Sequence, residues 1–291
     1  MTATARGRAI LAIIAATFVY AAAAACVKAL EGGVPLAQVV LFRSLFALPL
    51  LLVLMHRAGG WRLLRTRNPR IHALRTLFGL VGMATAFYGY ATLPLAGVTA
   101  LGFTMPLFLT LLAVPLLGER VDAARAAAVA VGFVGVLIMV QPWQAEGAYP
   151  PIPVLIVLVG ALAWALAMIT IRQMGAAGEA GVTIVLWFAL GCSAVALVWA
   201  LPGWRWPSAA QWILLAAVGL LSAVAQLLMT EGYRRADPTL LAPFEYAGIV
   251  WTTALGALLW SELPDGWDAA GIAVLVASGL FIWRREVTAR P

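Results

Sequence analysis

The chain has 291 residues, of which 64% are hydrophobic and only 11% are charged. A water-soluble domain carries about 25% charged residues, so this composition excludes a soluble enzyme or a soluble binding module. The formal charge of +7 does not indicate nucleic-acid binding, because the basic residues lie in short segments rather than on one contiguous face.

Ten mostly apolar stretches follow one another along the chain. A helix of about 20 apolar residues crosses the hydrocarbon core, and only helices or closed barrels satisfy their backbone hydrogen bonds there. The sequence therefore predicts an all-α polytopic membrane protein with ten transmembrane helices. In chain order the predicted spans are 8–29, 35–55, 72–91, 96–117, 124–141, 152–172, 180–201, 209–232, 239–260 and 266–284.

The distribution of arginine predicts the orientation in a bacterial-type inner membrane. If both termini are cytoplasmic, most basic residues fall in cytoplasmic segments, as the positive-inside rule requires. His72 is assigned to the basic cytoplasmic loop after the second span, Arg75 is counted on the cytoplasmic side, and Lys28 is expected to reach the opposite interface beside Glu31. The first span continues past Cys26, which argues against a cleaved signal peptide.

A repeat of about 143 residues divides the chain. Leu116 to Asp122 follows the fourth span, and the similar segment Leu259 to Asp265 follows the ninth. Residues 1–145 and 146–291 are therefore predicted to be two five-helix repeats. Since five is odd, the two copies must have opposite orientations in the bilayer, an arrangement that many secondary transporters use to bind substrate between the repeats.

These residues also carry a family resemblance. The Leu-Gly-Glu turn at 117–119, the Trp-Ser-Glu turn at 260–262, the Phe42-Arg43 step and the segment Ala242 to Tyr246 resemble the ten-helix, EamA-type branch of the drug/metabolite transporter superfamily. The resemblance covers almost the whole chain. It implies transport of small metabolites, often the export of amino acids, including aromatic ones.

Two ionisable residues stand out inside the predicted spans, where charge is costly and marks function. Arg43 lies in the second span and Glu245 in the ninth, and whether they pair is left open. Arg43 could bind a carboxylate or serve as a structural ion-pair partner. Glu245 could bind an ammonium group or exchange protons, and a zwitterion would satisfy both residues.

Polar and aromatic side chains at three- and four-residue steps indicate which helix faces line a central path. Helix packing through small residues is the alternative explanation for most of these positions. Deep aromatic rings could form a box for an apolar or cationic ligand. The candidate substrate-binding residues are Tyr20, Arg43, Tyr88, Phe103, Trp164, Gln226, Glu245 and Tyr246.

The sequence thus predicts a secondary transporter that exports amino acids by alternating access. No nucleotide-binding loop and no cluster of metal-ligand spacing is found, so neither a cofactor nor a metal is expected. The rival interpretation is a carrier of organic cations, carboxylates, or nucleoside or S-adenosyl derivatives. The expected partners are a small-molecule substrate and membrane lipids, while proton coupling and a homodimer are left open.

Overall fold

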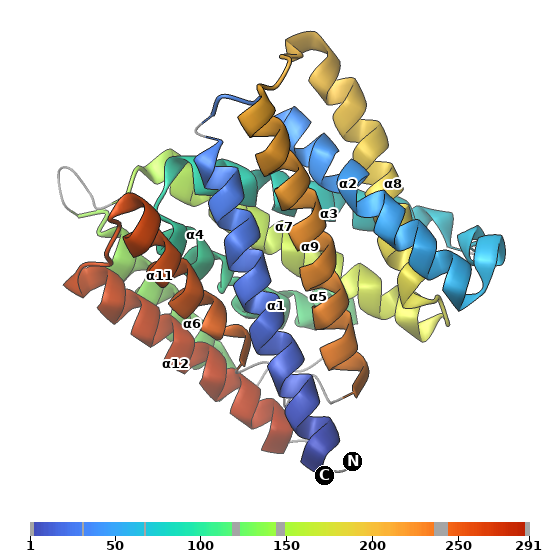
Figure 1. The fold of residues 1–291 in the computed structure, drawn as a ribbon. Coiled ribbons are helices and arrows are strands. Elements are labelled where there is room, and N and C mark those ends of the chain that lie inside the picture. The colour runs from blue at the N-terminus through green and yellow to red at the C-terminus, as the bar shows by residue number, and fades with distance from the viewer. Residues whose placement is uncertain are drawn as a thin grey trace.

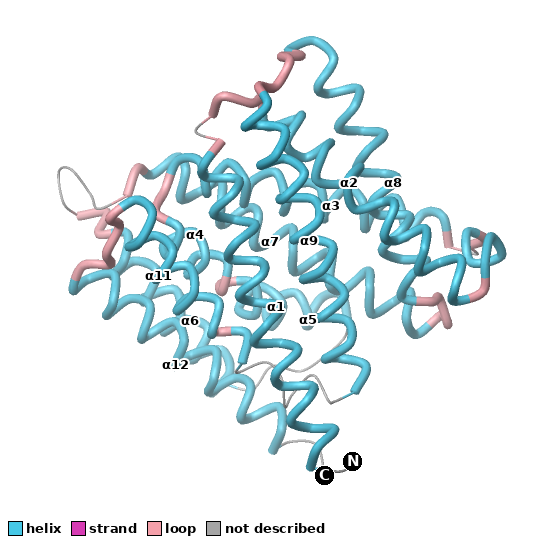
Figure 2. The backbone as a smooth tube through the Cα atoms, viewed as in Figure 1, coloured by secondary structure: helices cyan, strands magenta, loops and turns pink. Residues whose placement is uncertain are grey.

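The computed structural model describes residues 3–30, 32–66, 68–117, 123–143, 149–235 and 244–288. Within these ranges the chain is almost entirely helical and contains no strand (Figure 2). The predicted all-α fold is thereby confirmed. Parts of the repeat and of the family motifs lie outside the described residues, at 118–122 and 236–243. Glu31 also lies outside them.

The helices follow the predicted spans closely. In the described ranges, eight helical segments are long and apolar enough to cross a membrane, and one of them, Leu95–Leu112, runs through α4 into α5. Two apolar helices are shorter, Ala126–Val140 and Ala247–Trp260. The total of ten spans stays a prediction. The elements are α1 (Ala3–Ala29), α2 (Leu36–Ala58), η1 (Gly60–Leu64), α3 (Pro69–Thr92), α4 (Leu95–Gly102), α5 (Met105–Leu117), α6 (Ala123–Val140), α7 (Pro151–Ala176), α8 (Gly181–Ala200), η2 (Leu201–Gly203), α9 (Ala209–Arg235), α11 (Ala247–Trp260) and α12 (Gly266–Thr288) (Figure 1).

The fourth predicted span differs from expectation, because it consists of two helices rather than one. α4 ends at Gly102 and α5 begins at Met105. Pro106 has no N–H to continue the hydrogen-bond ladder, and it lies in the first turn of α5, where a helix tolerates proline best. Thr104 lies in the break and is buried. Its Oγ1 donates a hydrogen bond to the carbonyl of Leu101 at 2.6 Å.

Helices from the two ends of the chain pack against one another. The most extensive contacts are α1 with α9, α3 with α7, α6 with α12 and α2 with α8. Further contacts join α1 to α11, α2 to α9, α3 to α8, and both α4 and α5 to α7. Segments far apart in sequence therefore build one bundle, in which α1 begins and α12 ends at the same side (Figure 1).

Glycine allows one of these pairs to approach closely. A Cβ placed on Gly135 of α6 would lie 2.8 Å from the carbonyl oxygen of Gly271 in α12, and one on Gly271 would lie 2.6 Å from that of Gly135. Nearby, Ser278 Oγ donates a hydrogen bond to the Ala128 carbonyl at 2.6 Å. Small residues at a helix crossing are typical of membrane bundles, where association depends on packing and interhelical hydrogen bonds.

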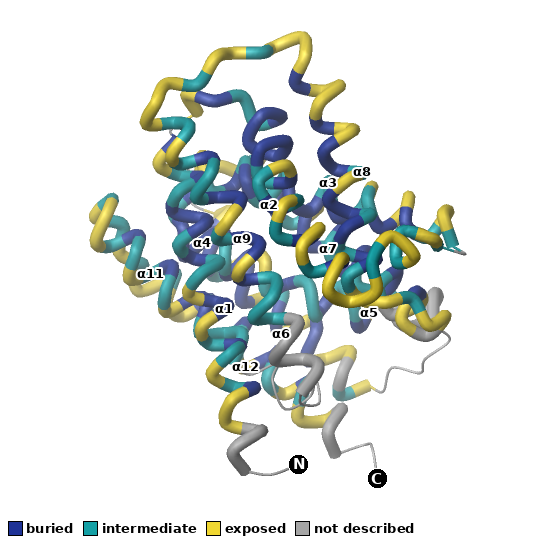
Figure 3. Tube along the Cα trace, turned by 45° about the vertical axis from the view of Figure 1, so that its right-hand side comes forward, coloured by how far each residue is buried: buried dark blue, intermediate teal, exposed yellow. Residues whose placement is uncertain are grey.

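Burial is distributed as expected for a protein surrounded by lipid. Large apolar side chains such as Leu11, Val198, Ile213 and Leu258 are exposed on the outside of the bundle, while buried residues face its interior (Figure 3). Exposed apolar surface on this scale is incompatible with an aqueous environment. The interior is accordingly the place where polar and charged side chains require an explanation.

Candidate functional site

A hydrogen bond between α1 and α9 lies at the centre of the candidate site. The hydroxyl of Tyr20 donates to Oε1 of Gln226 at 2.9 Å. Both side chains are half-buried, and both belong to the predicted set. The extensive packing of α1 on α9 brings them together, although they lie in opposite halves of the chain.

Charged residues outside α1 and α9 act electrostatically on Tyr20. Arg43 of α2 interacts electrostatically with Tyr20 and with Cys192 of α8. Glu245, just before α11, also acts on Tyr20. Tyr20 therefore interacts with both ionisable residues that the sequence singled out. The sequence left the pairing of Arg43 with Glu245 open, and their direct contact stays a hypothesis.

A second buried arginine was missed by the sequence analysis. Arg75 is counted with the cytoplasmic arginines at the start of the third predicted span, but in α3 it is buried and only 6% exposed. Its guanidinium carbon lies 4.1 Å from the ring centroid of Phe188 in α8 and 5.5 Å from that of Trp164 in α7. The charges of both Arg75 and Arg43 act on Tyr20 and on Cys192. Trp164 was predicted, but its cationic neighbour was not.

Two further predicted residues stack on each other. The rings of Phe103 and Tyr246 have centroids 4.6 Å apart and are tilted by 36°. The Tyr246 hydroxyl lies against Gly279 of α12. Since Glu245 interacts electrostatically with Tyr246, this aromatic pair adjoins the charged group around Tyr20.

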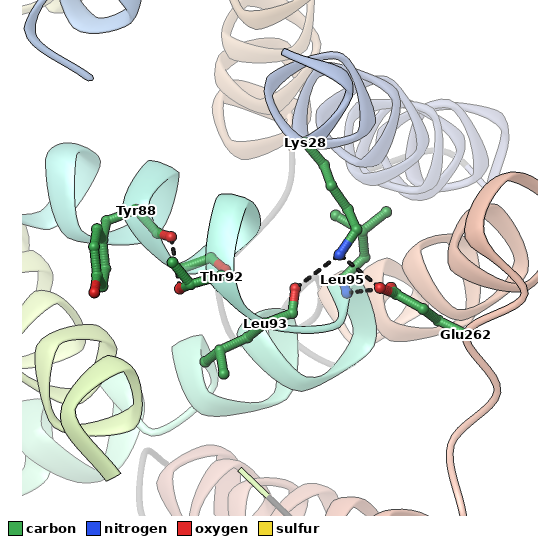
Figure 4. Close-up of polar contacts among 7 residues, drawn as sticks. Lys28, Tyr88, Thr92, Leu93, Leu95 and Glu262 are labelled. Atoms are coloured by element: carbon green, nitrogen blue, oxygen red, sulfur yellow. Dashed lines mark hydrogen bonds and ion pairs between the residues drawn. The ribbon is translucent and has the colours of Figure 1, made fainter. Parts of the chain in front are cut away.

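Tyr88 lies near the end of α3, apart from these contacts. Its backbone carbonyl accepts a hydrogen bond from Thr92 Oγ1 at 2.8 Å, and its ring points away from Lys28 and Glu262 (Figure 4). The structure thus relates seven of the eight predicted residues through direct contacts or electrostatic interactions. Among the residues that the structure describes, Tyr88 has no such link to the other seven.

Lys28, expected near the membrane interface, has partners within the protein that its sequence neighbours do not indicate. Its Nζ lies 2.6 Å from Oε1 of Glu262 and donates a hydrogen bond to the Leu93 carbonyl at 3.0 Å. The other carboxylate oxygen of Glu262 accepts a hydrogen bond from the Leu95 N–H at 3.3 Å (Figure 4). This group, here named the Lys28–Glu262 latch, joins the end of α1, the α3–α4 turn and the α11–α12 turn.

His72 is also placed differently from the prediction. It belongs to α3 and is only 3% exposed, with Nε2 lying 3.9 Å from Oε1 of Glu179. The same carboxylate oxygen accepts a hydrogen bond from Thr66 Oγ1 at 2.6 Å. Among the described residues, no three His, Cys, Asp or Glu side chains are grouped to hold a metal ion.

Comparison with known proteins agrees with this architecture. The family model for the EamA-like transporter family matches residues 7–141 and again 151–284. The chain is 33% identical to a riboflavin transporter of Rhizobium johnstonii, over 84% of this chain and 79% of the relative. It is 30% identical to the pseudopaline exporter CntI of Pseudomonas aeruginosa, over 95% of this chain and 96% of the relative.

A solved crystal structure shows that the fold has been seen before. It is 21% identical in sequence and aligns over 96% of this chain and 98% of its own length, with a TM-score of 0.67. The two family matches together cover nearly the whole chain, and they confirm the resemblance drawn from the sequence motifs. The chain therefore belongs to the EamA-like transporter family, and it is a multi-pass transporter of the inner membrane.

Proposed function

We propose that this transporter exports small zwitterionic metabolites, with large neutral or aromatic amino acids as the substrates of choice. The observation that carries the proposal is the position of Tyr20, which bonds to Gln226 and interacts with Arg43 and Glu245. Cationic, anionic and neutral polar groups thus meet inside an apolar bundle. A zwitterion offers the complementary carboxylate and ammonium groups.

We also propose that the two halves are inverted repeats that alternate in opening the site to either side. The helix contacts support this, because the same pairs of spans are in contact when each span is replaced by its counterpart in the other half. The first span packs on the eighth (α1 on α9), and the third packs on the sixth (α3 on α7). The second match to the same family model in the second half is further support. In such transporters the substrate lies between the repeats.

The experiment is counterflow into liposomes that contain the purified protein. We expect labelled phenylalanine or leucine to exchange well above protein-free vesicles, and organic cations to exchange poorly. Glu245→Gln should weaken amino-acid exchange about tenfold or more, since it removes the charge assigned to the ammonium group. Asp265→Asn is the matched control, because Asp265 is an exposed carboxylate in the α11–α12 turn.

The outcome discriminates between amino acids and other solutes. Normal amino-acid exchange by Glu245→Gln, at every pH tested, would show that Glu245 recognises no ammonium group and carries no proton. Exchange of cations but not of amino acids by the wild-type protein would overturn the proposed substrate class.

A planar aromatic solute is the second candidate substrate. A relative that covers most of the chain is a riboflavin transporter, and the stacked Phe103 and Tyr246 rings together with Trp164 offer aromatic surfaces. Ring systems prefer offset or tilted stacking at such centroid distances. Riboflavin is therefore included in the same counterflow series, and its exchange in preference to amino acids would favour this candidate.

A further inference from the structure

We propose that Arg75 is the anion-binding residue of this transporter and holds the carboxylate of the bound solute. The inference deepens the proposed function and depends on it only for the identity of that solute. It starts from the burial of Arg75, which is 6% exposed in the interior of the bundle. A guanidinium stays charged at any physiological pH, so burying it in a membrane protein demands a compensating partner.

The partners that the structure supplies are aromatic. Phe188 and Trp164 lie 4.1 Å and 5.5 Å from the guanidinium carbon, measured to their ring centroids. Aromatic rings stabilise the guanidinium by packing on its flat faces, but they do not accept hydrogen bonds from the N–H groups along its edges. Nε and Nη1 of Arg75 are fully buried and have no hydrogen-bond partner among the described residues. Two nitrogen donors, on different edges of the guanidinium, therefore remain for a ligand.

The charge around Arg75 favours an anion. Its electrostatic neighbours within the described residues are Cys192, Arg43 and Tyr20; Arg43 is a second cation, and none of the three is a carboxylate. Two like charges in a medium of low dielectric constant repel each other strongly. An anionic group bound here would relieve that repulsion and accept the donors of Arg75. A carboxylate is a strong acceptor for charge-assisted hydrogen bonds from guanidinium N–H groups.

The helix that carries Arg75 also makes room for its side chain. A Cβ on Gly79, one turn further along α3, would collide with Nη1 of Arg75, and it would lie 2.5 Å from the Phe188 ring. The absence of a side chain at Gly79 therefore permits the observed position of the guanidinium. Any larger residue would displace either the guanidinium or the ring that stacks on it.

The test measures binding rather than transport, so that it does not depend on which solute is carried. Phenylacetate and its neutral analogue phenylacetamide are titrated at equal concentrations, and the thermal midpoint of the purified protein is recorded. A ligand that binds the folded state raises this midpoint. We expect phenylacetate to stabilise the wild-type protein clearly more than phenylacetamide does. In Arg75→Gln the difference should disappear, while Arg75→Lys should retain part of it.

Gly79→Ala keeps the charge of Arg75 but moves the guanidinium, and it should reduce the preference for phenylacetate. This variant keeps the proposal testable if Arg75→Gln does not fold. Equal stabilisation of the wild-type protein by the two compounds, or an unchanged preference in Arg75→Gln, would overturn the assignment of Arg75. Failure of amino-acid counterflow, with the phenylacetate preference intact, would overturn only the proposed substrate.

Discussion

Tyr20 and Gln226 form the polar contact on which the candidate site is centred, and its contribution can be measured. A hydrogen bond contributes about 0.5–1.5 kcal/mol net, so Tyr20→Phe or Gln226→Leu should weaken substrate binding several-fold. Because the two side chains bond to each other, the double variant should be little worse than either single variant. The measurement is the half-saturation concentration in counterflow, with the four proteins forming a double-mutant cycle. Strictly additive losses would show that the two residues act independently on the substrate.

Individual site residues could be predicted where a helix face is itself distinctive. Tyr20, Gln226 and Glu245 are polar in otherwise apolar stretches, which is visible without a structure. Arg75 was missed because the positive-inside rule assigns arginines near a span end to the adjacent loop. Its burial depends on the stacking surfaces of Phe188 and Trp164, which come from other helices. No local pattern around Arg75 contains that information.

At the scale of elements, the Lys28–Glu262 latch connects three helix ends and should stabilise their arrangement. Lys28→Met leaves Glu262 without its cationic partner in a partly buried place, since the side chains are 13% and 25% exposed. We expect a loss of about 1–2 kcal/mol in stability, allowing for solvent screening of the partly exposed pair. The thermal midpoint of the purified protein measures it.

The charge-reversed pair Lys28→Glu with Glu262→Lys is the informative control. It restores an ion pair, yet it places a carboxylate beside the Leu93 carbonyl and an ammonium beside the Leu95 N–H. The reversed pair should therefore recover only part of the lost stability. Full recovery would mean that the two backbone contacts contribute nothing and that the ion pair alone holds the three helix ends.

Helix positions were predictable to within a few residues because a membrane span has a fixed minimum length. The bounds of α2, α8 and α12 all lie close to the predicted spans. The break between α4 and α5 was not predicted, although Pro106 marks it in the sequence. Proline in a membrane helix is often accommodated by a kink. Hydropathy alone does not distinguish such a kink from two separate helices.

At the scale of the whole molecule, the candidate site draws its residues from helices of both proposed halves. The first half supplies Tyr20 from α1, Arg43 from α2 and Arg75 from α3. The second half supplies Cys192 from α8 and Gln226 from α9. A solute bound among them would touch both halves at once. Relative movement of the halves would then change its environment, which is the physical requirement for alternating access.

The inverted arrangement proposed for the two halves makes a direct topological prediction. The α2–α3 segment of the first half corresponds to the α8–α9 segment of the second, so the two should face opposite sides of the membrane. Trp61 and Trp206 are suitable reporters, because they lie in these segments and are 68% and 81% exposed. Cysteines are introduced there singly with Cys26 replaced by alanine, while Cys192 is fully buried and can remain.

An impermeant maleimide added to intact cells should label Trp206→Cys, and should label Trp61→Cys only after the membrane is permeabilised. Leu263→Cys in the α11–α12 turn should also be labelled in intact cells. Ala180→Cys in the α7–α8 turn should be labelled only after permeabilisation. Both positions are exposed. Basic residues around η1 explain why that segment should stay inside, because positively charged segments are retained in the cytoplasm. Labelling of Trp61→Cys and Trp206→Cys from the same side would contradict inverted halves, and with them the symmetric opening that export through a central site requires.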